Sequence, residues 1–384
     1  MRRILPLLML VAFGATASCR KQPEGAVKVV VIGTTPALRD PADGPLSSSD
    51  QLLVANVAQG LVRFDAGGNV VGGLAERWTV TDDGLSYIFR LAATNWPDGS
   101  KLTAQQVTRL LKREISGRSK NSLKDAFGAV DDIVAMTDRV IEINLTSPRP
   151  DLLSLLAQPQ MAIIRNGQGT GPFAGVRGKE GTIRLTREIV SPDDETTTRE
   201  QLLLAGAAAP AAVQAFAAAN LDLVLGGTFA DLPFAQRVKL PRDTLRFDPA
   251  SGLFGLVPTQ SGGPFDKAEV RQLLSEAIDR DGFVAALAVP GLAPRATLLE
   301  AGLDGIPPPT PPAWAATVYA DRVAALQAQA GRLFGKGPKP PVRIALPDGP
   351  GGALLLHLLE RDWGQLGLTV ERSESAAAAD FVLV

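Results

Sequence analysis

Alternating apolar and polar positions predict a β-hairpin between Trp78 and Leu91, in the stretch "WTVTDDGLSYIFRL". Every second side chain of its second arm is large and apolar: Leu85, Tyr87, Phe89 and Leu91. This period of two predicts a strand with one face in a core. Asp83-Gly84 supplies the turn, because glycine accepts the positive φ that a tight hairpin loop requires. A hairpin alone indicates no function.

Apolar positions at helical spacing predict three helices with clear start signals. The first runs through "SDQLLVANVAQGLV", with Ser49 or Asp50 as its N-cap. The second follows a capping box formed by Thr103 and Gln106, because a threonine and a glutamine three residues later satisfy each other's backbone groups. The third follows Asp266, which is predicted as its cap.

The remaining patterns predict further strands and one βαβ unit, so the fold class is α/β with mixed sheets flanked by helices. "VKVVVI" is a near-continuous β-branched run and predicts a strand buried on both faces. "AVDDIVAMTDRVIEINL" predicts two strands about a Thr-Asp corner. Residues 201–220 are dominated by alanine and predict a helix, either solvated or broken by Pro210. The last unit is a strand at Val342–Pro347, a helix at Gly352–Leu366 and the strand "LTVE".

Size and composition limit the possible functions. A chain of 384 residues with 45% hydrophobic and 21% charged residues can bury a large core, and two lobes are expected. A net charge of -1 gives no electrostatic reason to expect a nucleic-acid partner. With one cysteine and one histidine, the chain offers few of the residues from which a zinc site or a hydrolase triad is built. His357 lies in an amphipathic helix pattern and is expected to be solvated.

The N-terminus predicts export from the cytoplasm. Arg2 and Arg3 precede an apolar run and small residues, which is the pattern of a secretory signal peptide over residues 1–19. The only cysteine, Cys19, follows directly, and "TASC" resembles a bacterial lipobox in which the cysteine is acylated. Thr16 departs from that motif, and ordinary cleavage after "ATA" is the alternative. We favour lipidation, because a sole cysteine at this point by chance is improbable.

Four segments in order resemble the extracellular solute-binding proteins of the dipeptide, oligopeptide and nickel type, which serve ABC importers. "LAERWTVTDDGLSYIFRL" and "NWPDGSKLTAQQVTRLLKR" are similar to the family's strand, turn and capped-helix signature. "GTGPF" is similar to its "GTGPY", and "PFDKAEVRQLLSEAIDRDGFV" to its arginine-containing helix segment. The resemblance runs from Val27 to the end and is thin between Ile189 and Asn220.

The resemblance implies a two-lobe periplasmic binding protein fold of type II that binds a solute without chemistry or cofactor. It implies a first lobe at residues 20–250, with a small subdomain at about 45–165, and a second lobe at 251–384 with an incomplete return to the first. It also implies a peptide or similar small polar solute, a permease and a separate ATPase as partners, a periplasmic location and a monomer. The expected ligand contacts are Thr34, Thr35, Gly169, Thr170, Phe173, Thr259 and Gln260.

Two departures keep alternatives open. Family members usually continue beyond a segment like "ADFVLV", and the crossover strand often ends in Asn where this chain has Thr259 and Gln260. The alternative is a non-transporting lipoprotein of the same fold with a structural or interaction role. The alanine-rich stretch also favours this alternative. For the residues of "GTGPF", a tight turn with positive φ is the competing interpretation.

Overall fold

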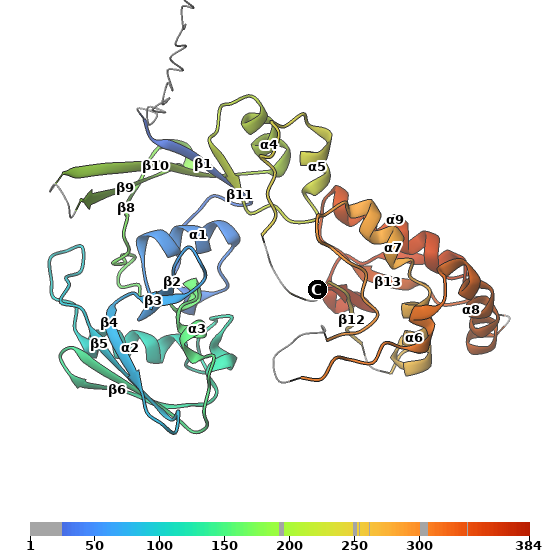
Figure 1. The fold of residues 1–384 in the computed structure, drawn as a ribbon, viewed down its shortest axis with the longest axis horizontal. Coiled ribbons are helices and arrows are strands. Elements are labelled where there is room, and N and C mark those ends of the chain that lie inside the picture. The colour runs from blue at the N-terminus through green and yellow to red at the C-terminus, as the bar shows by residue number, and fades with distance from the viewer. Residues whose placement is uncertain are drawn as a thin grey trace, which may run out of the picture.

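The protein is an α/β structure built around three larger sheets (Figure 1). The computed structural model describes residues 25–191, 196–248, 252, 254–260, 262–299, 306–335 and 337–384. The predicted signal peptide and Cys19 lie outside these residues. In the described part of the chain, no helix combines the length and the apolar character needed to cross a membrane.

The N-terminal sheet has five strands in the order β11-β1-β10-β9-β8. Its strands are β1 (Val27–Ile32), β8 (Ala174–Arg177), β9 (Ile183–Val190), β10 (Thr197–Ala207) and β11 (Leu223–Leu225). β1 is parallel to both of its neighbours, β10 and β11. Val29, Val30 and Val31 are all buried, which confirms the prediction of a strand with both faces covered.

The alanine-rich stretch is not the single helix that the sequence predicted. Residues 201–207 belong to β10, which pairs with β1 on one side and β9 on the other. Two ladders of backbone hydrogen bonds outweigh the helix propensity of a few alanine and leucine residues. The helix α4 (Ala209–Ala217) begins with Pro210 in its first turn, where proline costs no hydrogen bond. Pro210 therefore starts a helix and does not break one.

The small sheet has four antiparallel strands in the order β4-β5-β7-β6. Its strands are β4 (Ala75–Val80), β5 (Ser86–Leu91), β6 (Val130–Thr137) and β7 (Val140–Leu145). The predicted hairpin is confirmed: Tyr87, Phe89 and Leu91 are buried, and Gly84 has φ 69°. The helix α2 (Ala104–Glu114) packs Val107 and Leu111 into the same core. The two-stranded pair β2 (Val62–Phe64) and β3 (Val70–Gly72) lies beside this sheet in Figure 1.

Of the three predicted helix starts, one is confirmed and two are wrong. Thr103 and Gln106 form the capping box of α2 in both directions. The helix α1 (Ser48–Val57) is capped by Ser47, whose hydroxyl accepts from the Asp50 amide, so Ser49 and Asp50 lie inside the helix. Asp266 ends a 3-10 turn instead of capping α6 (Ala268–Glu276), and its carboxylate accepts from the Gly262 amide. Several polar residues compete for each cap, and the approach of the chain decides between them.

The C-terminal sheet has four strands in the order β12-β15-β13-β14. Its strands are β12 (Leu256–Pro258), β13 (Val342–Ala345), β14 (Val370–Arg372) and β15 (Phe381–Leu383). The predicted βαβ unit is confirmed, with β13 and β14 parallel and joined by α9 (Pro350–Gly364). His357 on α9 has a side chain that is 77% exposed, as a solvated residue should.

The other helices complete the layers. They are α3 (Leu152–Leu156), α5 (Leu232–Arg237), α7 (Arg280–Leu287) and α8 (Tyr319–Phe334). Buried residues of α6, α8 and α9 share one core with β13, β14 and β15, whereas α2 and α3 share a separate core with the small sheet. The chain before α5 touches the C-terminal part directly, because the Gly351 amide donates to the Ala230 carbonyl at 3.0 Å.

Candidate functional site

A polar cavity of about 750 Å³ lies at the carboxyl end of β1. Parallel strands direct their carboxyl ends to one edge of a sheet, where ligands of open α/β sheets are commonly bound. Thr34, one of the predicted contact residues, lines this cavity. The other lining residues include charged side chains from distant parts of the sequence: Arg39, Asp40, Asp43, Asp50 and Arg113.

The segment after β1 is held in place by the first turn of α1. Asp50 is only 3% exposed, and its carboxylate accepts from the Ala37 amide at 2.7 Å and pairs with Arg39 Nε at 3.2 Å. The Thr34 hydroxyl lies 3.3 Å from the Ser49 hydroxyl and 3.4 Å from that of Ser47. These bonds close the loop over the helix N-terminus, so the cavity wall is ordered by polar contacts.

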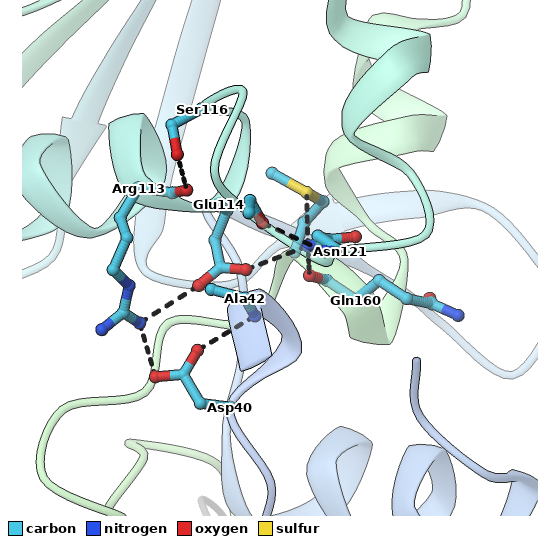
Figure 2. Close-up of polar contacts among 9 residues, drawn as sticks. Asp40, Ala42, Arg113, Glu114, Ser116, Asn121 and Gln160 are labelled. Carbon is cyan, nitrogen blue, oxygen red and sulfur yellow. Dashed lines mark hydrogen bonds and ion pairs between the residues drawn. The ribbon is translucent and has the colours of Figure 1, made fainter. Parts of the chain in front are cut away.

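Opposite α1, the end of α2 places a second set of charges at the cavity (Figure 2). Arg113 Nη2 donates to Asp40 Oδ2 at 2.5 Å and to Glu114 Oε1 at 3.2 Å, so one guanidinium nitrogen serves two carboxylates. Asn121 Nδ2 donates to the other oxygen of Glu114 at 2.9 Å and also to the Gln160 carbonyl at 2.7 Å. The network therefore joins the turn after β1, helix α2 and the loop that follows it.

Glu114 is the unusual member of this network, because its side chain is 2% exposed. Burial, with a smaller contribution from the nearby Asp40, raises the pKa of Glu114 to about 7, although the bonds from Asn121 and Arg113 act in the opposite direction. A carboxyl group in this position changes its charge close to neutral pH. The site thus has a titratable carboxyl group buried behind the lining of the cavity, in addition to the charged side chains that line it.

The "GTGPF" loop packs on the end of α1, and its glycines serve close approach instead of positive φ. The amides of Gly171 and Phe173 donate to the carbonyls of Val57 and Asn56, both at 3.0 Å. A Cβ atom on Gly169 would lie 2.4 Å from the Ala58 Cβ. Neither Gly169 nor Gly171 has a positive φ among the described glycines, so the tight-turn interpretation in that form is wrong.

The side chains of this loop face the protein. Phe173 is buried in the core of the N-terminal sheet, and the Arg187 guanidinium lies over its ring at 4.8 Å. The Thr170 carbonyl accepts from Gln59 Nε2 at 2.8 Å. A ligand contact of Gly169, Thr170 or Phe173 stays a prediction, and their contacts here explain the motif by packing.

The other predicted contact residues lie elsewhere. The methyl group of Thr35 lies beside Gly181, 2.8 Å from where a Cβ would be. Thr259 and Gln260 follow β12, where the Thr259 hydroxyl donates to the Ala379 carbonyl and Gln260 Nε2 donates to the Ala377 carbonyl at 3.0 Å. Among the hydrogen bonds of the described residues, none joins these two side chains to Thr34 or to the "GTGPF" loop.

A second cavity, of about 780 Å³, lies in the C-terminal part against α6 and α7. Its lining is dominated by core side chains such as Leu274, Leu359 and Trp363, and none of the predicted contact residues reaches it. The cavity at β1 is therefore the better candidate for a polar ligand.

Sequence patterns did not single out Asp40, Arg113 or Glu114, although two signals were present. Asp40 follows a buried strand by a few residues, which is where α/β proteins place polar ligand contacts. Glu114 stands seven residues after Val107 and three after Leu111, and so falls on the apolar stripe of its helix. A carboxylate at a core position is a signal for a shifted pKa.

Comparison with known families identifies the family of this chain. The family model "Bacterial extracellular solute-binding proteins, family 5 Middle" matches residues 69–381. The chain belongs to this family, which confirms the resemblance seen in its motifs.

Curated relatives match parts of the chain. A glutathione-binding protein of Pectobacterium atrosepticum is 30% identical over 158 residues, which are 40% of this chain and 30% of that protein. A probable deoxycholate-binding periplasmic protein of Escherichia coli is 29% identical over 28% of this chain and 24% of its own length. A dipeptide-binding protein of Lactococcus lactis is 30% identical over 28% of this chain and 22% of its own length. The chain thus spans less than a third of each of these relatives.

Solved structures share the fold over most of the chain. The protein OppA of Haemophilus influenzae, in complex with RPPGFSPFR, has a TM-score of 0.75 at 17% identity. That match covers 94% of this chain and 80% of the other. The murein tripeptide binding protein MppA of Escherichia coli has a TM-score of 0.74 at 17% identity, with 94% and 79% covered. At this identity the likeness shows the fold, which is the periplasmic binding protein fold expected from the sequence.

Proposed function

We propose that the protein is the substrate-binding component of an ABC importer, which captures a peptide or similar small polar solute outside the cytoplasmic membrane. The observation that carries the proposal is the cavity at the end of β1, which is lined by both cations and carboxylates. Arg39 and Arg113 suit the carboxylate of a zwitterion, and Asp40 and Asp43 suit its ammonium group. Family membership and relatives that bear the names of peptide-binding and glutathione-binding proteins support the same solute class.

The mechanism in this proposal is capture by closure, with no catalytic step. Residues 20–250 form the first lobe, with its small subdomain at about 45–165, and residues 251–384 belong to the second. The two lobes move about a hinge, and the extra contacts made to the solute in the closed form supply the energy of closure. Thr34 and Thr35 contact the solute from the first lobe, and Thr259 and Gln260 from the second.

The partners follow from this role. A membrane permease takes the solute from the closed protein, and a separate ATPase drives the transfer. The protein works as a monomer in the periplasm, and a lipid on Cys19 holds it at a membrane. The solute itself is the only small-molecule ligand, and no nucleic acid takes part.

Native mass spectrometry on gently purified protein, followed by thermal melting with a pool of dipeptides and tripeptides, tests the proposal. We expect a retained small mass or a melting shift of several degrees, because a ligand that binds only the folded state stabilises it by mass action. Arg39→Gln at the cavity should reduce the shift, whereas Arg77→Gln, on the exposed side of β4, should leave it unchanged.

A clean mass together with no shift for any peptide would favour the non-transporting alternative. The alanine-rich stretch no longer supports that alternative, since residues 201–207 belong to a regular strand within the N-terminal sheet and Ala209–Ala217 form a regular helix. The melting experiment therefore decides between the two hypotheses.

A further inference from the structure

We propose that Arg113 is the anion-binding group of the cavity at β1, and that binding of a carboxylate there is coupled to uptake of a proton by the buried Glu114. The inference rests on the proposed function, because it assigns a role within the same cavity. It adds a recognition residue, the chemical class of the group recognised, and a dependence of affinity on pH.

The guanidinium of Arg113 has N–H donors that its bonds to Asp40 and Glu114 do not use. Its side chain is 46% exposed, and it lines the cavity. In the described part of the chain, its bonds to Asp40 and Glu114 both use Nη2. Nε and Nη1 carry further N–H groups, and each can donate a single charge-assisted hydrogen bond to a carboxylate oxygen.

With Glu114 ionised, the group formed by Asp40, Arg113 and Glu114 has a net charge of minus one, which opposes the approach of another carboxylate. With Glu114 protonated, the same group is neutral, and the guanidinium can accept a third carboxylate at a lower electrostatic cost. Glu114 itself is buried behind Arg113 and does not line the cavity, so it acts on the solute through Arg113. It is a positioning residue in this mechanism.

The other charged groups on the packed elements do not take over this role. On the turn after β1, Asp43 lines the cavity as a further carboxylate and does not bond Glu114 among the contacts of the described residues. On the neighbouring 3-10 turn, the Lys124 ammonium bonds the Ser119 carbonyl at 2.9 Å. Between α2 and β6, Lys112 and Asp132 pair with each other at 2.7 Å. Glu114 is thus the buried carboxyl group that contacts Arg113 directly from behind the cavity.

Thermodynamic linkage fixes the direction of the effect. Because the carboxyl of Glu114 titrates near pH 7, lowering the pH through this range protonates it and should tighten the binding of an anion at Arg113. By reciprocity, an anion bound at Arg113 should raise the pKa of Glu114 further. Binding should therefore take up protons at pH 7.

Acetate is the probe for the test, because it presents a carboxylate alone. In the purified protein with ¹⁵N-labelled arginine, the Nε–H resonance of Arg113 is followed during acetate titrations at pH 6 and pH 8 at constant ionic strength. For a coupling of one pKa unit we expect the dissociation constant for acetate to be about fivefold lower at pH 6 than at pH 8, since the full factor of ten is reached only when Glu114 is entirely protonated at one pH and entirely ionised at the other. Arg109 is exposed on the same helix, and its resonance serves as the internal control in the same spectra.

Glu114→Gln should bind acetate equally at both pH values, within a factor of two. The same difference between pH 6 and pH 8 persisting in Glu114→Gln would overturn the coupling, and an Arg113 resonance that acetate never shifts would overturn the site. If this variant does not fold, the ¹³C carboxyl resonance of Glu114 in the unaltered protein decides, because acetate must then raise its titration midpoint. If peptides bind without any response of the Arg113 resonance, this inference alone is refuted. If no peptide binds at all, the proposed function is refuted.

Discussion

Burial of one carboxylic acid gives the fold a dependence on pH. The pKa of Glu114 rises from its ordinary 4.5 to about 7 in the folded protein. Between these pH values the folded state holds more protons than the unfolded state, so the free energy of unfolding falls as pH rises from 4.5 to 7 and is level above. From a shift of this size we expect a loss on the order of 2–3 kcal/mol.

Urea denaturation at pH 5 and pH 8 measures that loss, and Glu114→Gln should remove it, because an amide does not titrate. Glu371→Gln, on the exposed side of β14, is the matched control and should keep the pH dependence of the unaltered protein. An identical pH dependence in Glu114→Gln would show that the stability change comes from other groups.

At the scale of elements, the "GTGPF" loop and the end of α1 are joined by close backbone approach. A Cβ atom on Gly171 would lie 2.4 Å from the carbonyl carbon of Val57, so Gly171→Ala must push the loop away from the helix. We expect a loss of roughly 1–3 kcal/mol of stability, seen as a lower melting temperature. Gly117→Ala meets nothing within 4 Å and should change stability by less than about 0.5 kcal/mol. Equal melting temperatures for the two variants would contradict this role.

At the scale of the whole molecule, the buried residues of the small sheet and those of the C-terminal sheet form different cores. Leu273 is fully buried in the second of them, and Leu273→Ala should cost roughly 2–5 kcal/mol there. Hydrogen exchange should become faster in α6, α9 and β13 and stay unchanged in β4 to β7, because local stability follows the core that is damaged. Uniform acceleration in both cores would mean that the two parts unfold as one unit.

Several elements could be predicted because their signals are local. The hairpin depends on alternation within one strand and a glycine in its turn, and the start of α2 depends on a bond pair three residues apart. The helix caps at Ser47 and Lys267 and the strand β10 were missed. For β10 partners outside the segment decided the outcome, because β1 and β9 pair with residues of the alanine-rich stretch.

The sequence by itself determined the family, the α/β class and the position of Thr34 at the end of a buried strand, because short-range periodicity and ordered motifs encode these. Only the tertiary structure brought Asp40 and Asn121 to the neighbouring pair Arg113 and Glu114, since the turn after β1, helix α2 and the loop after it are separate segments. The pKa of Glu114 likewise depends on burial and on the charge of Asp40, which no single stretch of chain contains. Electrostatics of this kind arise from packing, and so the site required the fold.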